Sequence, residues 1–274
     1  MNMKERKKVL LWLLIVAVLL AASIITGNHA GQSETIQQTM RDAVLHNENR
    51  IDLLGWKAVN PGLISGFVVT AILLIAAAVL RVFWIPRFKY VPGRCQLVLE
   101  EVVGLFDRMA KTSSPRMNRF LGAYIFGAGV YIFVGTLFEL FGLQAITTAG
   151  RAITLPAPLS DVNGAIALGC LSYVVILSGG IAGNGIKGVK ATLKEFSLPI
   201  SMSFRLFGAL LSGLLVTELV YYYINLSYIL PVVVGVLFTL LHAVIQSYVL
   251  TMLTAIEPVS YTHLRAHETL ANLV

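Results

Sequence analysis

The sequence has 274 residues, of which 57% are hydrophobic and 13% are charged. A soluble domain uses about 25% charged residues to cover its surface, so this composition excludes an ordinary soluble protein and predicts a membrane protein. The formal net charge is +7, but the basic residues lie between the apolar stretches, which indicates membrane orientation rather than nucleic-acid binding.

Six apolar stretches predict membrane-spanning helices, because a helix satisfies its own backbone polar groups in hydrocarbon. The strict alternation of a membrane barrel is absent. We therefore expect an all-α polytopic membrane protein with about six transmembrane helices. In chain order the stretches cover residues 9–26, 62–85, 120–143, 162–182, 198–224 and 229–256.

The first stretch belongs to an N-terminal segment, residues 1–26, that begins with several basic residues. Such a segment is either a signal anchor or a cleaved signal peptide, and the lack of a clean small-x-small cleavage pattern favours a retained helix with a cytoplasmic N-terminus. Residues 27–60 are polar with mixed charge, and we expect them to form an extracytoplasmic loop. The membrane domain is predicted to cover residues 61–257.

Two basic segments, residues 87–119 and 184–196, are expected to be cytoplasmic loops. The first contains apolar residues at helical spacing, which predicts an amphipathic helix lying on the membrane face. Its apolar residues are Leu97, Val98, Val102, Leu105, Phe106 and Met109.

Residues 258–274 turn abruptly polar directly after the last apolar stretch. The run SYTHLRAHET within them resembles translated adapter sequence, so we expect a non-native tail, with a genuine short tail as the alternative. On the first interpretation His263, His267 and Glu268 form no metal site. No other metal site is predicted, because the two cysteines lack the spacing of metal ligands.

The most informative residue is Arg205, a charge in the first third of the apolar stretch 198–224. A charge at the bilayer centre costs at least about 2.5–3.5 kcal/mol, and a guanidinium cannot lose its proton, so Arg205 must face a partner or water. Snorkelling toward the helix end is the alternative. Small residues around Arg205 predict a face that another helix can approach closely. They are Ser201, Ser203, Gly208, Ser212 and Gly213.

Four further polar residues lie in the apolar stretches. His242 and Gln246 are one helical turn apart, so they share a face. Gln246 could orient a guanidinium without cancelling its charge, whereas His242 is either a proton relay or a hydrogen-bonded structural residue. Glu218 lies 13 residues after Arg205, or about 20 Å along a helix axis. Glu218 and Glu139 are each either an ion-access residue or an interfacial glutamate.

The pattern PISMSFRLFG, followed one helix later by IQSYVLTMLT, resembles the paired C-terminal helices of subunit a of F-type ATP synthases. The segments VPGRCQLVLEEVVGLFDRM, FELFGL and PLSDVNGAIAL are similar to further parts of that family. The resemblance implies a five-helix core with a long tilted C-terminal hairpin, in a bacterial inner membrane. It also implies two offset half-channels, separated by an arginine that faces a rotating ring of c subunits. By position Arg205 is that arginine, and Gln246 is its polar neighbour.

The implied partners are the c ring, subunit b, the rest of the ATP synthase and membrane lipid, with no nucleic acid. The sequence also departs from the family pattern. The family usually has Asn at the positions that Ala209 and Glu139 occupy here. The family often has an acidic residue at the position of Leu214, and Glu218 lies one helical turn after it. His242 likewise lies about one turn from the usual polar position on its own helix. A divergent member with a displaced access channel is therefore expected.

The resemblance implies an ion-conducting, non-catalytic subunit without a cofactor. The sequence contains no Gly-rich phosphate loop, so we also expect no nucleotide site in this chain. The expected ion is H⁺, with Na⁺ as the alternative. A secondary transporter that binds an anionic substrate at Arg205 is the runner-up, and it would require broken helices and internal symmetry. A membrane-embedded enzyme finds no support, because paired aspartates, H-E-x-x-H and a Ser/Lys dyad are absent.

Overall fold

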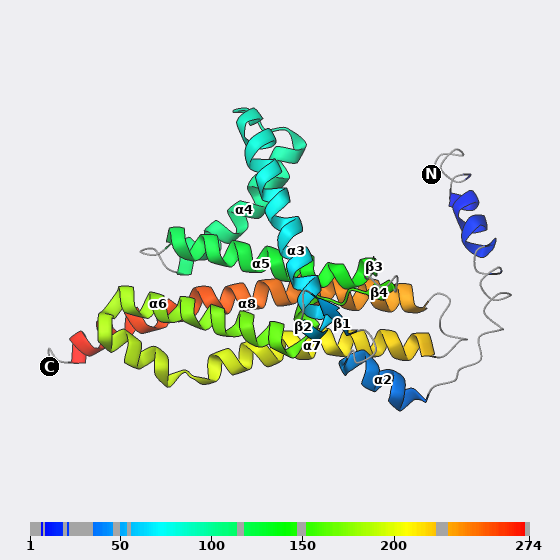
Figure 1. The fold of residues 1–274 in the computed structure, drawn as a ribbon. Coiled ribbons are helices and arrows are strands. Elements are labelled where there is room, and N and C mark those ends of the chain that lie inside the picture. The colour runs from blue at the N-terminus through cyan, green and yellow to red at the C-terminus, as the bar shows by residue number, and fades with distance from the viewer. Residues whose placement is uncertain are drawn as a thin grey trace. The chain divides into compact units, whose positions relative to one another are not determined.

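The computed structural model describes residues 7, 9–18, 21, 35–45, 50–53, 56–113, 118–146, 152–222 and 230–271. Helices dominate it (Figure 1), and five of them are long and apolar enough to cross a membrane. This confirms the predicted all-α membrane fold. The spans are Pro61–Arg87, Phe120–Phe141, Val162–Ile181, Ser197–Tyr222 and Leu230–Ile256.

The predicted first stretch, residues 9–26, is described only in part. Val9–Val18 forms a shorter apolar helix, and most of the remainder lies outside the described residues. The predicted turn between the last two spans also falls outside them. Whether the first stretch is an anchor or a cleaved signal therefore stays a prediction.

The chain divides into two compact units. The smaller comprises Met1–Glu48 and Leu211–Phe238, and the larger comprises Asn49–Leu210 and Thr239–Val274. The smaller unit contains the helix α2 (Ile36–Leu45). The larger unit begins with the short antiparallel strands β1 (Ile51–Leu53) and β2 (Trp56–Val59).

The main helices follow in chain order. They are α3 (Pro61–Val79), continued by a π-helical turn Leu80–Trp84 and a 3-10 turn Ile85–Arg87, then α4 (Arg94–Ser113), α5 (Asn118–Phe141), α6 (Val162–Lys194), α7 (Ser197–Tyr222) and α8 (Leu230–Ala271). Between α5 and α6 lie a hairpin of β3 (Gln144–Ile146) and β4 (Ala152–Thr154) and the 3-10 turn η3 (Pro158–Ser160).

The start of α3 shows how the sequence sets a helix boundary. Asn60 precedes the helix, and its side chain accepts a 2.9 Å hydrogen bond from the backbone N–H of Gly62. Pro61 occupies the first turn, where its missing N–H removes no helical hydrogen bond. The helix therefore begins sharply at the polar-to-apolar change in the sequence.

The main core of the larger unit joins four helices and η3. Side chains from α5, α6, α7 and α8 meet at a cluster of buried residues, so these helices pack side by side (Figure 1). The cluster comprises Ala128, Ile132, Leu159, Ala165, Ile176, Met202, Leu206, Leu210 and Leu250. It fixes which face of α7 points inward.

A second cluster attaches α4 to α5. Phe106 and Ala110 of α4 are buried against Leu121 and Ile125 of α5 and Ala255 of α8. The predicted amphipathic helix is confirmed at α4. The chain covers the apolar face of α4 only in part, because Leu97, Val98, Val102 and Leu105 remain exposed.

Three features differ from the sequence-based expectation. The predicted basic loop 184–196 is wrong for most of its length, because α6 continues to Lys194. Glycines and lysines together suggested a loop, but lysines also stabilise the C-terminal end of a helix through the helix dipole. The two hairpins were missed, since strands of three or four residues carry little periodicity. The helix α8 also runs through the predicted tail to Ala271.

Candidate functional site

The helix α7 has two distinct faces where it belongs to the larger unit. Met202, Leu206 and Leu210 are almost completely buried in the main core. Arg205, although adjacent to Leu206, is exposed. Successive helical residues are separated by about 100°, so the packing of Leu206 inward turns the guanidinium away from the core.

The surroundings of Arg205 on this face are small. Ser201, one turn before it, and Gly208, one turn after it, are both exposed. A Cβ added at Gly208 would find nothing within 4 Å. Arg205 forms no hydrogen bond or ion pair with any residue that the structure describes. The charge is therefore presented at an open, small-residue face of the chain.

The orientation of α7 is set by its close approach to α6. Gly169 of α6 is buried, and a Cβ there would lie 3.0 Å from the carbonyl oxygen of Pro199 and still closer to the Ser203 hydroxyl. Ser203 donates a 2.7 Å hydrogen bond to that same oxygen. The first turns of α7 thus press on a glycine two turns after the start of α6. Sequence reasoning missed Gly169, because the need for glycine depends on which helix lies opposite.

The helix α8 brings Gln246 and His242 to the larger unit. Gln246 is 7% exposed, and His242 is half-buried. The Oε1 atom of Gln246 is buried without a hydrogen-bond partner among the described residues. An unsatisfied buried acceptor costs about 1–3 kcal/mol, so this atom does not stabilise the packing of the described chain.

Gln246 and Arg205 lie on two helices that both contribute residues to the main core cluster. Leu206, which follows Arg205, and Leu250, one turn after Gln246, are both in the main core cluster. The structure places no hydrogen bond between the arginine and the glutamine. The predicted pairing of these two residues stays a prediction, while their placement on neighbouring packed helices is observed.

The two glutamates belong to different units of the chain. Glu139 is half-buried near the end of α5 in the larger unit. Glu218 is half-buried on the part of α7 that belongs to the smaller unit. In the part of the chain that the structure describes, no group of three or more His, Cys, Asp or Glu residues could hold a metal ion.

Comparison with known proteins gives the family. The family model of the ATP synthase A chain matches residues 64–256, which include most of α3, all of α4 to α7 and most of α8. Two proteins named ATP synthase subunit a, from two strains of Cereibacter sphaeroides (ATCC 17025 and ATCC 17029), are each 28% identical over 198 residues. These alignments cover 68% of this chain and 76% of each relative. The chain therefore belongs to the ATP synthase A chain family, whose members translocate ions in the membrane sector of the ATP synthase complex.

Proposed function

We propose that Arg205 is the charge barrier between two offset half-channels, and that it faces a carboxylate on a ring of c subunits. The observation that carries this proposal is the exposure of Arg205 on a face with Ser201 and Gly208. A guanidinium facing lipid is unfavourable by at least about 2.5–3.5 kcal/mol, so an exposed arginine in a membrane span requires water or an anion opposite. Small residues beside it allow a second helix to approach.

The chemistry of the barrier follows from the fixed charge. A positive charge near a carboxylate stabilises its ionised form, so a ring carboxylate that arrives at Arg205 releases its ion. The same charge repels cations that would pass directly between the half-channels. Each charge that crosses a potential of about 100 mV contributes about 2.3 kcal/mol, which drives rotation of the ring.

The remaining polar residues are assigned to the access paths. Gln246 orients the guanidinium without neutralising it, since an amide carries no charge. Glu218 lies on the same continuous helix as Arg205 and serves one half-channel. Glu139 and His242 line the aqueous path, where a histidine near neutral pH can relay protons. The proposed ion is H⁺, with Na⁺ as the alternative. The choice between the two ions is made mostly by the ring, which carries the ion-binding carboxylate.

The proposal includes the cellular setting. The chain lies in a bacterial inner membrane with its basic segments in the cytoplasm, and it contacts the c ring and subunit b. A secondary transporter with an anionic substrate at Arg205 is disfavoured, because such sites are typically formed by broken helices. The helix that carries Arg205 is continuous from Ser197 to Tyr222.

The test is ATP-driven ion pumping by the whole complex in vesicles. Arg205→Ala is expected to abolish pumping while the complex still assembles. Arg81→Ala is the matched control, because Arg81 is also an exposed arginine within a predicted span. Pumping at the wild-type rate by Arg205→Ala would contradict the proposal. A chain that never copurifies with a c ring would instead favour the transporter.

A further inference from the structure

A basic pocket lies where the chain passes from α3 into α4. It has a volume of about 500 Å³, and its lining includes Trp84, Arg87, Lys89 and Arg94. None of these three cations forms an ion pair with a residue that the structure describes. Three uncompensated positive charges around one pocket repel one another and favour an anion between them.

The other two cations of α4 that the structure places are already neutralised. Arg108 pairs with Glu101, and Lys111 pairs with Asp107, each at 2.6 Å. The carboxylates of Glu101 and Asp107 are therefore paired with other cations of α4. Arg94 is thus the one cation of α4, among the described residues, that has no ion-pair partner, and it lines the pocket together with Arg87 and Lys89, which precede the helix.

The pocket is held in shape by Gln96. Its Oε1 accepts a hydrogen bond from the backbone N–H of Lys89 at 3.1 Å, and its Nε2 donates to the carbonyl oxygen of Lys89 at 3.0 Å. Nε2 also donates to Glu100 at 2.7 Å. The segment that carries Lys89 is thus fixed on the first turn of α4, so an anion meets a preformed site.

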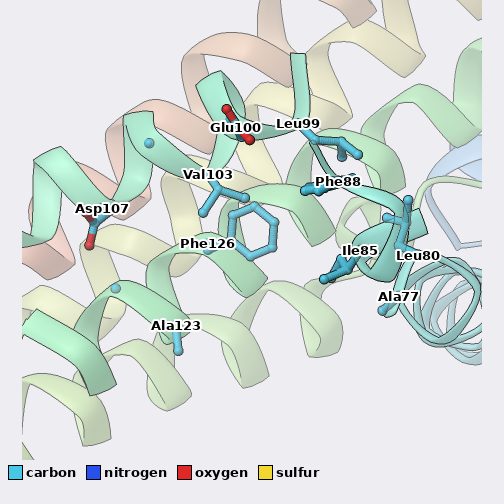
Figure 2. Close-up of a pocket in the computed structure, with 12 residues that line it drawn as sticks. Ala77, Leu80, Ile85, Phe88, Leu99, Glu100, Val103, Asp107, Ala123 and Phe126 are labelled. Atoms are coloured by element: carbon cyan, nitrogen blue, oxygen red, sulfur yellow. The ribbon is translucent and has the colours of Figure 1, made fainter. Parts of the chain in front are cut away.

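An apolar cavity shares one lining residue with the basic pocket, and Figure 2 shows the residues that line this cavity. It has a volume of about 720 Å³ between the end of α3, one face of α4 and the first half of α5. Phe88 lines both spaces. The apolar lining of the cavity includes Leu80, Ile85, Phe88, Leu99, Val103 and Phe126. Its two acidic residues, Glu100 and Asp107, are engaged by Gln96 and Lys111.

We propose that this combined site binds an anionic phospholipid. The phosphate lies among Arg87, Lys89 and Arg94, and an acyl chain enters the cavity beside Phe88 and Phe126. Basic pockets between membrane helices select anionic headgroups, and a cavity of this size is in the range of small-molecule sites. A free phosphate would use the cations but not the apolar cavity. The proposal does not depend on the role of Arg205.

The test uses the intact ATP synthase complex in mild detergent. Phosphatidylglycerol with a photoreactive group in its acyl chain is added, and the labelled peptides are identified after irradiation. Label is expected on the α4 and α5 peptides that contain Val103 and Phe126. The double variant Lys89→Gln/Arg94→Gln is expected to reduce labelling on the order of tenfold.

The matched control is Arg108→Gln/Lys190→Gln, which removes two positive charges outside the lining of the pocket and the cavity and should leave labelling unchanged. A second variant, Val103→Trp, fills the cavity and should also reduce labelling. Assembly of each variant is checked by its migration with the complex.

Four results would overturn the proposal. These are equal loss of label in both double variants, equal labelling by phosphatidylcholine, displacement of the lipid by excess glycerol phosphate alone, and no label in the wild-type complex. The third would indicate a free-phosphate site, and the fourth a surface covered by another subunit.

Discussion

The hydroxyl of Ser247 on α8 donates a 2.8 Å hydrogen bond to the backbone carbonyl oxygen of Gly129 on α5. This approach requires glycine, because a Cβ at position 129 would lie 2.6 Å from the Phe106 ring and 3.1 Å from Cγ2 of Thr251. The helices α4, α5 and α8 therefore meet at one residue. Gln246 precedes Ser247, so this contact also fixes the rotation of α8 that buries the amide.

Gly129→Ala is expected to destabilise the chain by about 1–3 kcal/mol, because overpacking forces neighbouring side chains or helices apart. The ring of Phe106 must move or α4 must shift away. Gly127→Ala is the control on the same helix, since a Cβ there meets nothing within 4 Å. Thermal unfolding of the solubilised protein should show a lower Tm for the first variant only. Equal Tm values for the two variants would contradict the observed packing.

Ser247→Ala removes the hydrogen bond between α8 and α5. Interhelical hydrogen bonds in membranes contribute about 0.6 kcal/mol on average, and rarely more than about 1.7 kcal/mol. A small loss of stability is therefore expected. Thr254→Ala is the control, because the Thr254 hydroxyl bonds to the carbonyl of Leu250 within its own helix. A larger loss in Thr254→Ala than in Ser247→Ala would show that the interhelical bond is not the stabilising element.

Much of the fold was predictable from the sequence, because hydrocarbon permits few structures. The ends of α5 and α7, and those of the whole span Pro61–Arg87, fall within two residues of the predicted spans, since each apolar run must form a helix. The amphipathic α4 was predictable from its periodicity. Arg205 stood out because a charge in an apolar run is rare and costly.

The rest depended on which helices lie opposite one another. Hydropathy does not reveal that Gly129 faces Phe106 or that Gly169 faces Ser203, because both requirements arise only when a second helix approaches. The direction in which Arg205 points follows from the burial of Leu206, which is a tertiary fact. The extension of α6 beyond Ile181 was missed because its glycines and lysines form a pattern that is typical of a loop.

Gln246→Leu separates function from stability. The variant removes an amide whose Oε1 is buried without a partner among the described residues, so the Tm should stay equal or rise slightly. If the amide orients Arg205, ATP-driven pumping should fall severalfold in the same variant. The paired measurements are the Tm of the complex and the pumping rate in vesicles. Pumping that is unchanged, or that falls only together with the Tm, would contradict an orienting role for Gln246.

Gly208→Phe tests whether the face of Arg205 is a docking surface. A Cβ at Gly208 meets nothing within 4 Å among the described residues, and Gly208 is exposed, so we expect a larger side chain there to extend away from the core. The stability of the chain should therefore change only by the intrinsic preference of glycine and phenylalanine for helix, which is a few tenths of a kcal/mol. If a c ring packs on this face, the ring cannot approach, and pumping should fall at least tenfold. Gly127→Phe is the control, because Gly127 is an equally open glycine on another helix. Equal pumping by the two variants would show that nothing docks beside Arg205.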